Sequence, residues 1–415
     1  MKRRVVITGM GTVNAIGLNV AETWESVLVG RNGIGNITLF DCSRQKPYLV
    51  GEVKNFDMEK YFPPKEAKRL DRVMAFAIVA ANEAYQNSQL ENVEIDRDKF
   101  GIYVTSGIGG LWTINEESRK AHLQSADRIS PFFVPNSIIN LVGGNIAIRL
   151  QAKGACLAIV SACSSATNAI GEAYRAIQHG YLDLILAGGA EAAINELGIG
   201  GFASMKAISP SLDPNRASIP FDRERSGFVI AEGAGVLMLE AYDQAIKRNA
   251  KIYAEIIGYS SNCDAFHITQ PDETASGIIK CMRNALADAE ISPAKIDYIN
   301  PHGTSTYYND RLETKAIRAV FADHSDQLSI GATKSMHGHA LGAVGGIESV
   351  ITIKALENGV VPPTINYREK DPECDLDYTP NHAKTRPLHY ALKNSLGFGG
   401  NNATLIYRKW DETDA

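Results

Sequence analysis

Cys163 is the residue of this sequence best placed for nucleophilic chemistry. It stands where an apolar run, Leu157–Val160, gives way to small residues and then to a helical stripe of Ala and Ile side chains. A thiol at a helix N-terminus lies beside unpaired N–H groups and the positive end of the helix dipole, which favour the thiolate. The small neighbours also permit the sharp turn that exposes a nucleophile. From this segment alone, a buried structural cysteine remains the alternative.

Two histidines could serve the same site. His302 follows the β-like run Ile296–Asn300, and His339 follows the run Leu328–Ala332. Residues at the carboxyl ends of strands converge on the functional crevice of an α/β sheet. Two imidazoles beside a thiolate would suit acyl transfer. Either histidine alone could equally be an ordinary hydrogen-bonded loop residue, so the hypothesis depends on both loops and the cysteine turn sharing one placement.

Two further features accompany these loops. Lys334 precedes a glycine-rich segment and would need a partner if buried, and Glu348, fourteen positions later, is the nearest candidate along the chain. Near the C-terminus, three glycines surround Phe398. This composition is typical of a mobile loop that carries a bulky plug, although a plain turn leading into a strand fits as well.

The elements that must position these residues alternate along the chain. Near-continuous apolar strands between helices predict an α/β fold in which a sheet is covered on both faces. Gly180 stands where the C-terminal cap of a helix is expected. Strands are expected at Val5–Thr8, Ile102–Thr105, Leu157–Val160, Leu182–Ala187, Val236–Leu239, Tyr253–Tyr259, Ile296–Asn300, Leu328–Ala332 and Ala403–Tyr407, and helices at Asp71–Ser88, Ser164–His179, Ala275–Ala289 and Leu312–Ala322.

No linker divides the chain, and the best seam is the charged stretch Asp243–Lys251. We expect two α/β halves, with Cys163 in residues 1–250 and with His302, Lys334 and His339 in residues 251–415. This duplication is inferred from the order of the elements, because no sequence repeat is visible.

The composition excludes several classes of protein. With 415 residues, 45% of them hydrophobic and 21% charged, the chain can bury a large core. A net charge of −5 gives no reason to expect a nucleic-acid binder. No apolar run approaches the ~18 residues of a membrane span, and Val5–Gly9 is too short for a signal peptide, so we expect a cytoplasmic protein without membrane insertion. Six cysteines without a C-x-x-C pair speak against a disulfide framework and a zinc site.

Together these motifs resemble the β-ketoacyl-acyl carrier protein synthases, the condensing enzymes of fatty acid synthesis, and among them the elongating class called synthase II. The resemblance runs from about Arg4 to Tyr407. It implies a thiolase-like, five-layered α/β/α/β/α fold with two pseudo-symmetric halves, and a homodimer. Four ordered motifs carry it: Val160-Ser-Ala-Cys163-Ser-Ser, Asn300-Pro-His302-Gly-Thr-Ser-Thr306, Lys334-Ser-Met-His-Gly-His339 and Gly397-Phe398-Gly-Gly.

The resemblance implies decarboxylative condensation. Cys163 would take the acyl chain from an acyl carrier protein as a thioester, and the backbone N–H groups of Cys163 and Phe398 would form the oxyanion hole. His302 and His339 would bind the malonyl thioester carbonyl and stabilise the enolate left by loss of CO₂. The enolate would then attack the acyl-Cys. This chemistry implies neither a metal nor a redox cofactor.

The resemblance also implies supporting and binding residues. Lys334 paired with Glu348 would organise the site. Because carrier proteins are acidic, a basic patch is expected at the tunnel mouth despite the net negative charge. The implied positions are Thr304 and Thr306 for the phosphopantetheine arm; Ile108, Phe202 and the partner subunit's Phe133 for the acyl pocket; Phe398, Gly399, Thr269 and Asp264 for the gate; and Lys65, Lys68, Arg69, Arg128 and Lys206 for docking.

Some positions depart from the family pattern. His337 adds a third imidazole beside the catalytic loop, where it could perturb the pH dependence or point away. Tyr307-Tyr308 could narrow the pantetheine tunnel. Pro301 and Leu396 are further departures, and none of the four removes a catalytic group.

Other functions stay open within and outside this family. A polyketide-type ketosynthase would share every catalytic residue and differ in pocket and partner. A thiolase would need a second catalytic cysteine, which Cys374 does not match, and the priming synthases have Asn where His339 stands. A non-catalytic chain-length subunit would have lost the nucleophile, whereas Cys163 is present.

Overall fold

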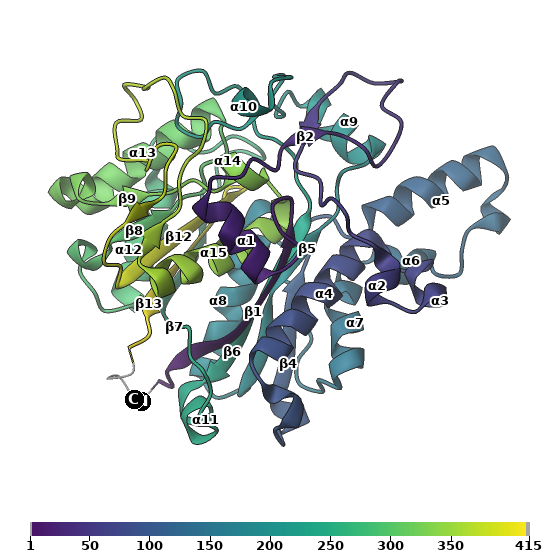
Figure 1. Ribbon diagram of the computed structural model, residues 1–415, viewed down its shortest axis with the longest axis horizontal. Coiled ribbons are helices and arrows are strands. Elements are labelled where there is room, and N and C mark those ends of the chain that lie inside the picture. The colour runs from purple at the N-terminus through teal and green to yellow at the C-terminus, as the bar shows by residue number, and fades with distance from the viewer. Residues whose placement is uncertain (1, 412–415) are drawn as a thin grey trace.

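The computed structural model describes residues 2–411 (Figure 1). Within these residues, nine strands join in one twisted sheet. Their order across the sheet is β4 (Phe100–Thr105), β5 (Leu184–Glu191), β6 (Gly233–Ala241), β1 (Val5–Asn14), β7 (Ala254–Cys263), β13 (Asn401–Lys409), β12 (Tyr390–Gly397), β8 (Tyr298–Asn300) and β9 (Ser329–Ile330).

The sheet repeats one topology twice. In the N-terminal half, the extended segment at Cys156 is parallel to β4, β4 is parallel to β5, and β6 is antiparallel to both β5 and β1. In the C-terminal half, β9 is parallel to β8, β8 is parallel to β12, and β13 is antiparallel to both β12 and β7. The antiparallel pair β1–β7 joins the two sets. The fold therefore has two pseudo-symmetric halves, although no sequence repeat reveals them.

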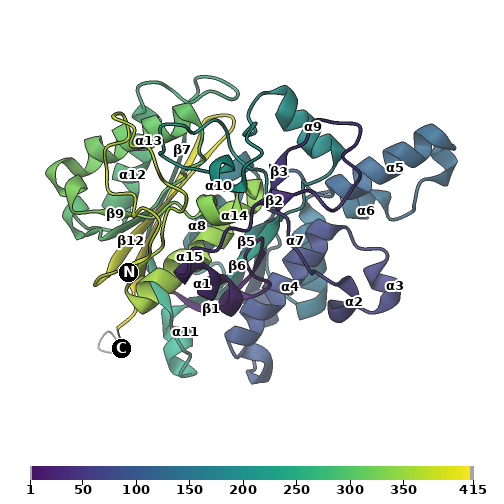
Figure 2. The same ribbon diagram turned by 45° about the horizontal axis from the view of Figure 1, so that its top comes forward.

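Helices divide the molecule into five layers (Figures 1 and 2). Helices α8 (Ser165–Gln178) and α15 (Val344–Asn358) form the middle layer and share one buried cluster with both halves of the sheet. Helices α4 (Arg72–Asn87) and α7 (Asn140–Leu150) cover the outer face of the N-terminal half, whereas α12 (Ser276–Asp288) and α13 (Tyr307–Phe321) cover that of the C-terminal half. Neighbouring strand residues face opposite layers, as Leu405 and Ile406 of β13 do.

Shorter elements surround the layers. Helices α9 (Glu196–Ser204), α10 (Pro214–Ala217) and α14 (Lys334–His337) lie above the sheet in Figure 1, and α5 (Leu111–Leu123) projects from the body beside α6 (Phe133–Ser137). The remaining α-helices and strands are α1 (Val20–Leu28), α2 (Met58–Tyr61), α3 (Pro64–Ala67), α11 (Tyr242–Lys247), β2 (Gly35–Asn36), β3 (Leu49–Val50), β10 (Val360–Val361) and β11 (Lys384–Thr385). No helix within residues 2–411 is long and apolar enough to span a membrane.

One strand expected from the sequence was wrong, and several elements were not expected, among them strand β12 and helices α5 and α7. Leu157–Val160 forms no regular strand: the adjacent Cys156 bridges to Ile102 and the Leu157 N–H donates to the carbonyl of Ile102 at 3.0 Å, where the pairing with β4 ends. Strand β12 escaped because it carries the polar run Lys393-Asn-Ser, which lacks apolar alternation. Helix α15, on which Glu348 lies, is buried nearly all round and has no polar face to mark its period.

The middle layer depends on close backbone contact. A Cβ added to Gly346 of α15 would lie 2.1 Å from the carbonyl oxygen of Gly235 in β6. A Cβ on Gly345 would lie 2.2 Å from Thr167 Oγ1 of α8. Only glycine permits this approach of α15 to the sheet and to α8.

We expect Gly346→Ala to lower the free energy of unfolding by about 2 kcal/mol or more, because the added methyl must push two backbones apart. Gly200→Ala on α9 is the matched control, since no heavy atom lies within 4 Å of its added Cβ. Alanine is the better helix former, so the control should be neutral or slightly stabilising. Urea unfolding followed by circular dichroism measures both; equal midpoints would contradict the close-packing argument.

Candidate active site

Cys163 lies in a strained turn that opens helix α8. Ala162, the preceding residue, has a φ of +52°, in the left-handed region that favours glycine. Serine hydroxyls hold the turn: Ser164 Oγ donates to the carbonyl of Ser161 at 2.7 Å, and Ser165 Oγ donates to the carbonyl of Ala162 at 2.7 Å. The turn presents the sulfur at the helix N-terminus and is fixed by its own side chains.

The Cys163 thiol is protonated in the resting site. Its side chain is 8% exposed, and burial raises the pKa of Cys163 to about 12. The charge of Lys334 and the backbone N–H groups of Phe398 and Cys163 act in the opposite direction. The helix dipole alone would predict a larger fraction of thiolate than this buried site allows. The same two N–H groups face the sulfur and could stabilise the oxyanion of an acyl group that the sulfur attacks.

His302 and His339 meet as two neutral imidazoles. Their ring centroids are 5.4 Å apart and their planes cross at 85°. Burial, followed by the charge of Lys334, lowers the pKa of each well below its ordinary value. The His302 loop is held by Glu313 of α13, whose carboxylate accepts the backbone N–H groups of His302 and Gly303 at 2.7 and 2.9 Å. Each neutral ring has one N–H to offer a ligand.

Behind the histidines, one buried carboxylate is shared by two buried ammonium groups. Lys334 Nζ lies 2.7 Å from Glu348 Oε1 and donates to the carbonyl of His302 at 2.5 Å. Lys393 Nζ lies 2.9 Å from Glu348 Oε2. Burial acts to raise the pKa of Glu348, but the two ammonium groups lower it overall. Glu348 is therefore ionised, and the cluster lies at 1% exposure or less.

These groups converge on one cavity of about 430 Å³. Cys163, His302, His339 and Phe398 line it. Thr304 Oγ1 and Thr306 Oγ1, 3.0 Å apart, also reach its surface. Among the other sequence-predicted residues, the lining includes Phe202, Thr269, Asp264 and Lys206, together with Tyr307, Tyr308 and Leu396.

The Phe398 segment is a turn between β12 and β13. Gly399 and Gly400 have φ values of +80° and +73°, so the turn needs glycine at both positions. The N–H of Gly399 donates to the carbonyl of Ile268 at 2.8 Å, and the N–H of Asp264 donates to that of Gly400 at 2.8 Å. The turn and the segment at 264–268 are thus tied together at the cavity wall.

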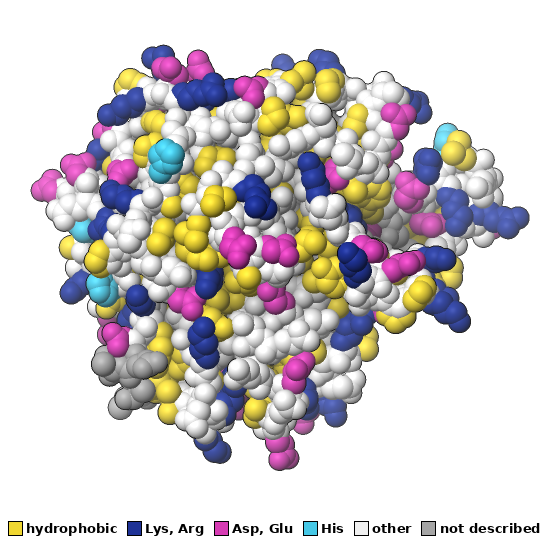
Figure 3. Space-filling model, in the orientation of Figure 1, with side chains coloured by type: hydrophobic (Ala, Val, Ile, Leu, Met, Phe, Trp, Pro, Cys, Tyr) yellow, Lys and Arg dark blue, Asp and Glu magenta, His cyan; other side chains and the backbone are white. Residues whose placement is uncertain are grey.

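Other sequence-predicted residues lie away from this cavity. Ile108 packs in the apolar cluster that contains Cys163, and Phe133 lies on α6 outside the cavity lining. Lys68 and Arg69 line a separate hollow, where the Arg69 guanidinium stands 5.0 Å from the Phe132 ring. Lys65 and Arg128 are both exposed, and Figure 3 shows Lys and Arg side chains over α3 and α5.

The structure shows where two of the positions that depart from the family pattern lie. His337 is buried outside the cavity, with Nε2 3.1 Å from Thr333 Oγ1, and burial lowers the pKa of His337 to about 4. Tyr307 and Tyr308 stand about half exposed in the cavity lining, with ring centroids 5.4 Å apart. The third imidazole therefore points away, whereas the tyrosines flank the entrance.

Several supporting residues escaped the sequence analysis. Lys393 and Glu313 lie within elements whose helical or strand pattern masks them. Glu191 accepts Ser106 Oγ and the N–H groups of Gly107 and Gly342, which ties two loops beside the site. Lys393 carries no local signal of its own, because the strand that buries it was itself not expected.

The fold and the site define a thiolase-like condensing enzyme. Family models for the β-ketoacyl synthase N-terminal and C-terminal domains match residues 2–245 and 253–368. The chain therefore belongs to the β-ketoacyl synthase family.

Curated relatives match along nearly the whole chain. The 3-oxoacyl-acyl-carrier-protein synthase 2 of Synechocystis sp. is 44% identical over 410 residues, covering 99% of each chain. The synthase 2 of Coxiella burnetii is 44% identical over 407 residues, covering 98% of each.

Solved structures of two ketosynthases superpose closely on this chain. A type II polyketide ketosynthase, solved with its acyl carrier protein, superposes with a TM-score of 0.91 at 34% identity, covering 99% of this chain and 100% of that one. A β-ketoacyl synthase from Burkholderia phymatum gives 0.91 at 32% identity with the same coverage.

The buried, protonated thiol predicts a pH dependence. Alkylation of Cys163 by iodoacetamide should accelerate about tenfold per pH unit from pH 7 to 9 without a plateau, because a thiol with a pKa near 12 is deprotonated only slightly in this range. Peptide mass spectrometry after timed quenching measures the rate at Cys163. The exposed Cys263 in the same digest is the internal control for the reagent. A plateau below pH 9 would show that the thiolate is already formed.

Proposed function

We propose that this protein is an elongating 3-oxoacyl-acyl carrier protein synthase, which joins a malonyl unit to an acyl chain with loss of CO₂. The observation that carries the proposal is the convergence of Cys163, His302 and His339 on one cavity, with the Lys334–Glu348 pair behind them. The relatives at 44% identity carry this activity in their names.

In the first half-reaction, Cys163 sulfur attacks the acyl thioester of a carrier protein. The carbonyl oxygen becomes an oxyanion, which the N–H groups of Cys163 and Phe398 stabilise. The intermediate collapses with cleavage of the old carbon–sulfur bond. The leaving carrier thiolate takes up the proton that Cys163 gives up, so no external acid or base is consumed.

In the second half-reaction, a malonyl thioester occupies the cavity. Its carbonyl oxygen accepts N–H groups from His302 and His339, the bond to the carboxylate breaks, and CO₂ leaves. The electron pair forms an enolate, whose carbon attacks the acyl-Cys163 carbonyl. Cys163 thiolate is expelled and takes a proton from solvent. The product is a 3-oxoacyl thioester two carbons longer.

The phosphopantetheine arm would enter between Thr304, Thr306 and the Tyr307-Tyr308 pair. Arg225, whose side chain is fully buried, donates to the carbonyls of Thr306 and Tyr307 at 3.3 and 3.1 Å. These bonds fix the loop on which the arm would lie.

A polyketide-type ketosynthase is the second candidate. The observation in its favour is the 0.91 superposition with a type II polyketide ketosynthase, although that protein is only 34% identical. Mass spectrometry of products separates the two candidates. A fatty acid enzyme should extend saturated acyl chains of graded length by one unit, whereas poly-β-keto products would favour the second candidate.

We propose further that the protein is a homodimer, with halves at residues 1–250 and 251–415 in each chain. The edge segment beside β4 exposes Leu157 and Val160 by about half and has no strand on its outer side within residues 2–411. A second copy could pair there and bring its Phe133 to this chain's acyl pocket. A mass of one chain in sedimentation equilibrium would contradict the dimer.

The dimer would also complete the docking surface for an acidic carrier protein. Lys206 already lines the cavity. Arg69 stacks on Phe132, next to Phe133, and its carbonyl accepts Asn136 Nδ2 of α6 at 2.5 Å. If Phe133 enters the partner's pocket, Lys68 and Arg69 are carried to the partner's cavity mouth.

Cys163→Ala should abolish condensation, because both acyl transfer and carbon–carbon bond formation pass through the sulfur, while malonyl decarboxylation stays measurable, because loss of CO₂ does not need it. His302→Ala and His339→Ala should reverse the pattern: radiolabelled acyl transfer to Cys163 persists, but decarboxylation falls by about 100-fold or more, because the enolate loses a preorganised donor. Equal loss of both half-reactions in the histidine variants would count against the assigned roles.

The double reversal Lys68→Glu with Arg69→Glu should raise the KM for acyl carrier protein substrates about tenfold at low salt, because like charges oppose docking. Added salt should shrink the difference from the wild type. Lys247→Glu on α11, at the far end of the molecule in Figure 1, is the matched control and should leave KM unchanged. An unchanged KM in the double variant would contradict the docking role of Lys68 and Arg69.

A further inference from the structure

Lys393 is a second buried lysine that the condensation scheme leaves without a role. It lies on β12 with its side chain at 0% exposure. Its Nζ is 2.9 Å from Glu348 Oε2 and 3.2 Å from Ser395 Oγ, and it also donates to the carbonyl of Asn394. A buried ammonium with this many partners is held in one position.

These contacts connect both halves of the active site. Glu348 Oε2 faces Lys393 while Glu348 Oε1 faces Lys334, which in turn holds the carbonyl of His302. On the other side, Ser395 Oγ lies 2.7 Å from Thr167 Oγ1 in α8, the helix that Cys163 opens. Lys393 therefore stands between the cysteine helix and the histidine loops.

The charged groups facing this lysine are few. Glu348 of α15 and Glu313 of α13 attract its charge, and Lys334 of α14 repels it. Burial is the largest influence and, with Lys334, lowers the pKa of Lys393 to about 8. The charge of Lys393 in turn helps to lower the pKa of both His302 and His339, and that of the buried His337.

We propose that Lys393 is a positioning residue for decarboxylation. Its ammonium holds one oxygen of Glu348 so that the other stays on Lys334. Its positive charge stabilises the enolate and disfavours protonation of the two histidines. This inference rests on the proposed condensing function. Negative charge develops on the malonyl thioester oxygen as CO₂ leaves, and a fixed positive charge in a low-dielectric interior stabilises it. When Lys393 loses its proton, this stabilisation is lost.

The sign of the pH effect follows directly. Below about pH 8 the ammonium is intact and decarboxylation is fast; above it the rate declines toward that of an enzyme without the charge. Lys393→Gln keeps an amide donor for Glu348 and Asn394 but carries no charge. Its rate should be flat through this range and at least about tenfold lower at pH 7.

The experiment measures CO₂ release from a malonyl thioester between pH 6 and 9.5. A Cys163→Ala background is used so that the thiol does not titrate. With Lys393 present, the rate should show an inflection near pH 8. With Lys393→Gln added, the inflection should vanish, and the two rates should converge at the alkaline end. Circular dichroism melts establish that both proteins are folded.

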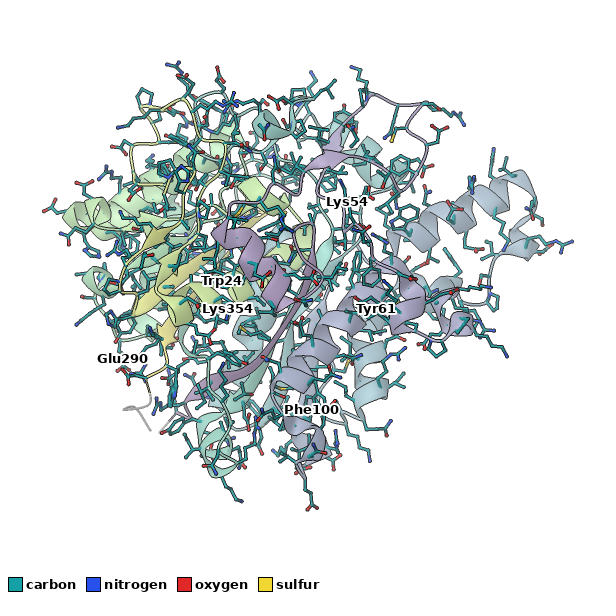
Figure 4. All side chains as sticks on the ribbon, viewed as in Figure 1. Trp24, Lys54, Tyr61, Phe100, Glu290 and Lys354 are labelled. Carbon is teal, nitrogen blue, oxygen red and sulfur yellow. The ribbon has the colours of Figure 1, made fainter. Side chains whose placement is uncertain are left out.

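Lys354→Gln is the matched control. Lys354, labelled in Figure 4, belongs to α15, the helix of Glu348, but pairs with Glu357 and does not line the cavity. This variant removes the same charge away from the cavity and should keep the inflection.

The outcomes separate the two proposals. A full rate in Lys393→Gln, or parallel pH profiles, would overturn the role of Lys393. If that variant does not fold, the profile with Lys393 present still decides, because the absence of an inflection between pH 7 and 9 contradicts the proposal. No CO₂ release from the Lys393-containing protein at any pH would instead overturn the condensing function.

Discussion

The rest of the site depends on how a single carboxylate, Glu348, is kept ionised in the core. Taking a charge out of water is costly unless opposite charges and hydrogen bonds surround it, and removing one partner of such a pair typically costs about 3–5 kcal/mol. Lys334 and Lys393 meet its two oxygens from α14 and β12. The carboxylate must therefore sit where three elements converge, and this requirement fixes the start of α15 against the histidine loops.

The same requirement explains the tight middle layer. Cys163, the proposed nucleophile, lies in the turn that opens α8 in the N-terminal half, while both histidines come from loops of the C-terminal half. Their mutual placement depends on α15, which carries Glu348 and touches both halves. Gly345 and Gly346 let α15 approach α8 and β6 closely, just ahead of Glu348. Backbone contact at the helix start thus positions a charge three residues later.

The sequence predicts the chemistry better than it predicts the electrostatics. Cys163, His302 and His339 follow apolar runs at points where chains turn, and that local signal is enough to place them at one edge of a sheet. Lys393 gives no such signal, since its partner Glu348 is 45 positions away and only folding brings them together. The strand predicted at Leu157–Val160 is absent, because a strand needs backbone hydrogen bonds to a neighbouring segment, and an apolar run does not show whether that neighbour is present. The sequence also did not predict that the Cys163 thiol is protonated, because burial raises its pKa more than the helix dipole lowers it.

The two lysines also determine how the histidines work. An imidazolium at His302 or His339 would be a third positive charge beside Lys334 and Lys393, at a buried position where solvent screens charge weakly. Both rings therefore stay neutral, and in the proposed condensation they would act on the malonyl thioester as N–H donors instead of as acids. A neutral donor stabilises the enolate without giving it a proton, so the carbon nucleophile survives until it meets the acyl group on Cys163. Proton transfer from a charged histidine would quench the enolate and waste the decarboxylation, which the surrounding positive charge prevents.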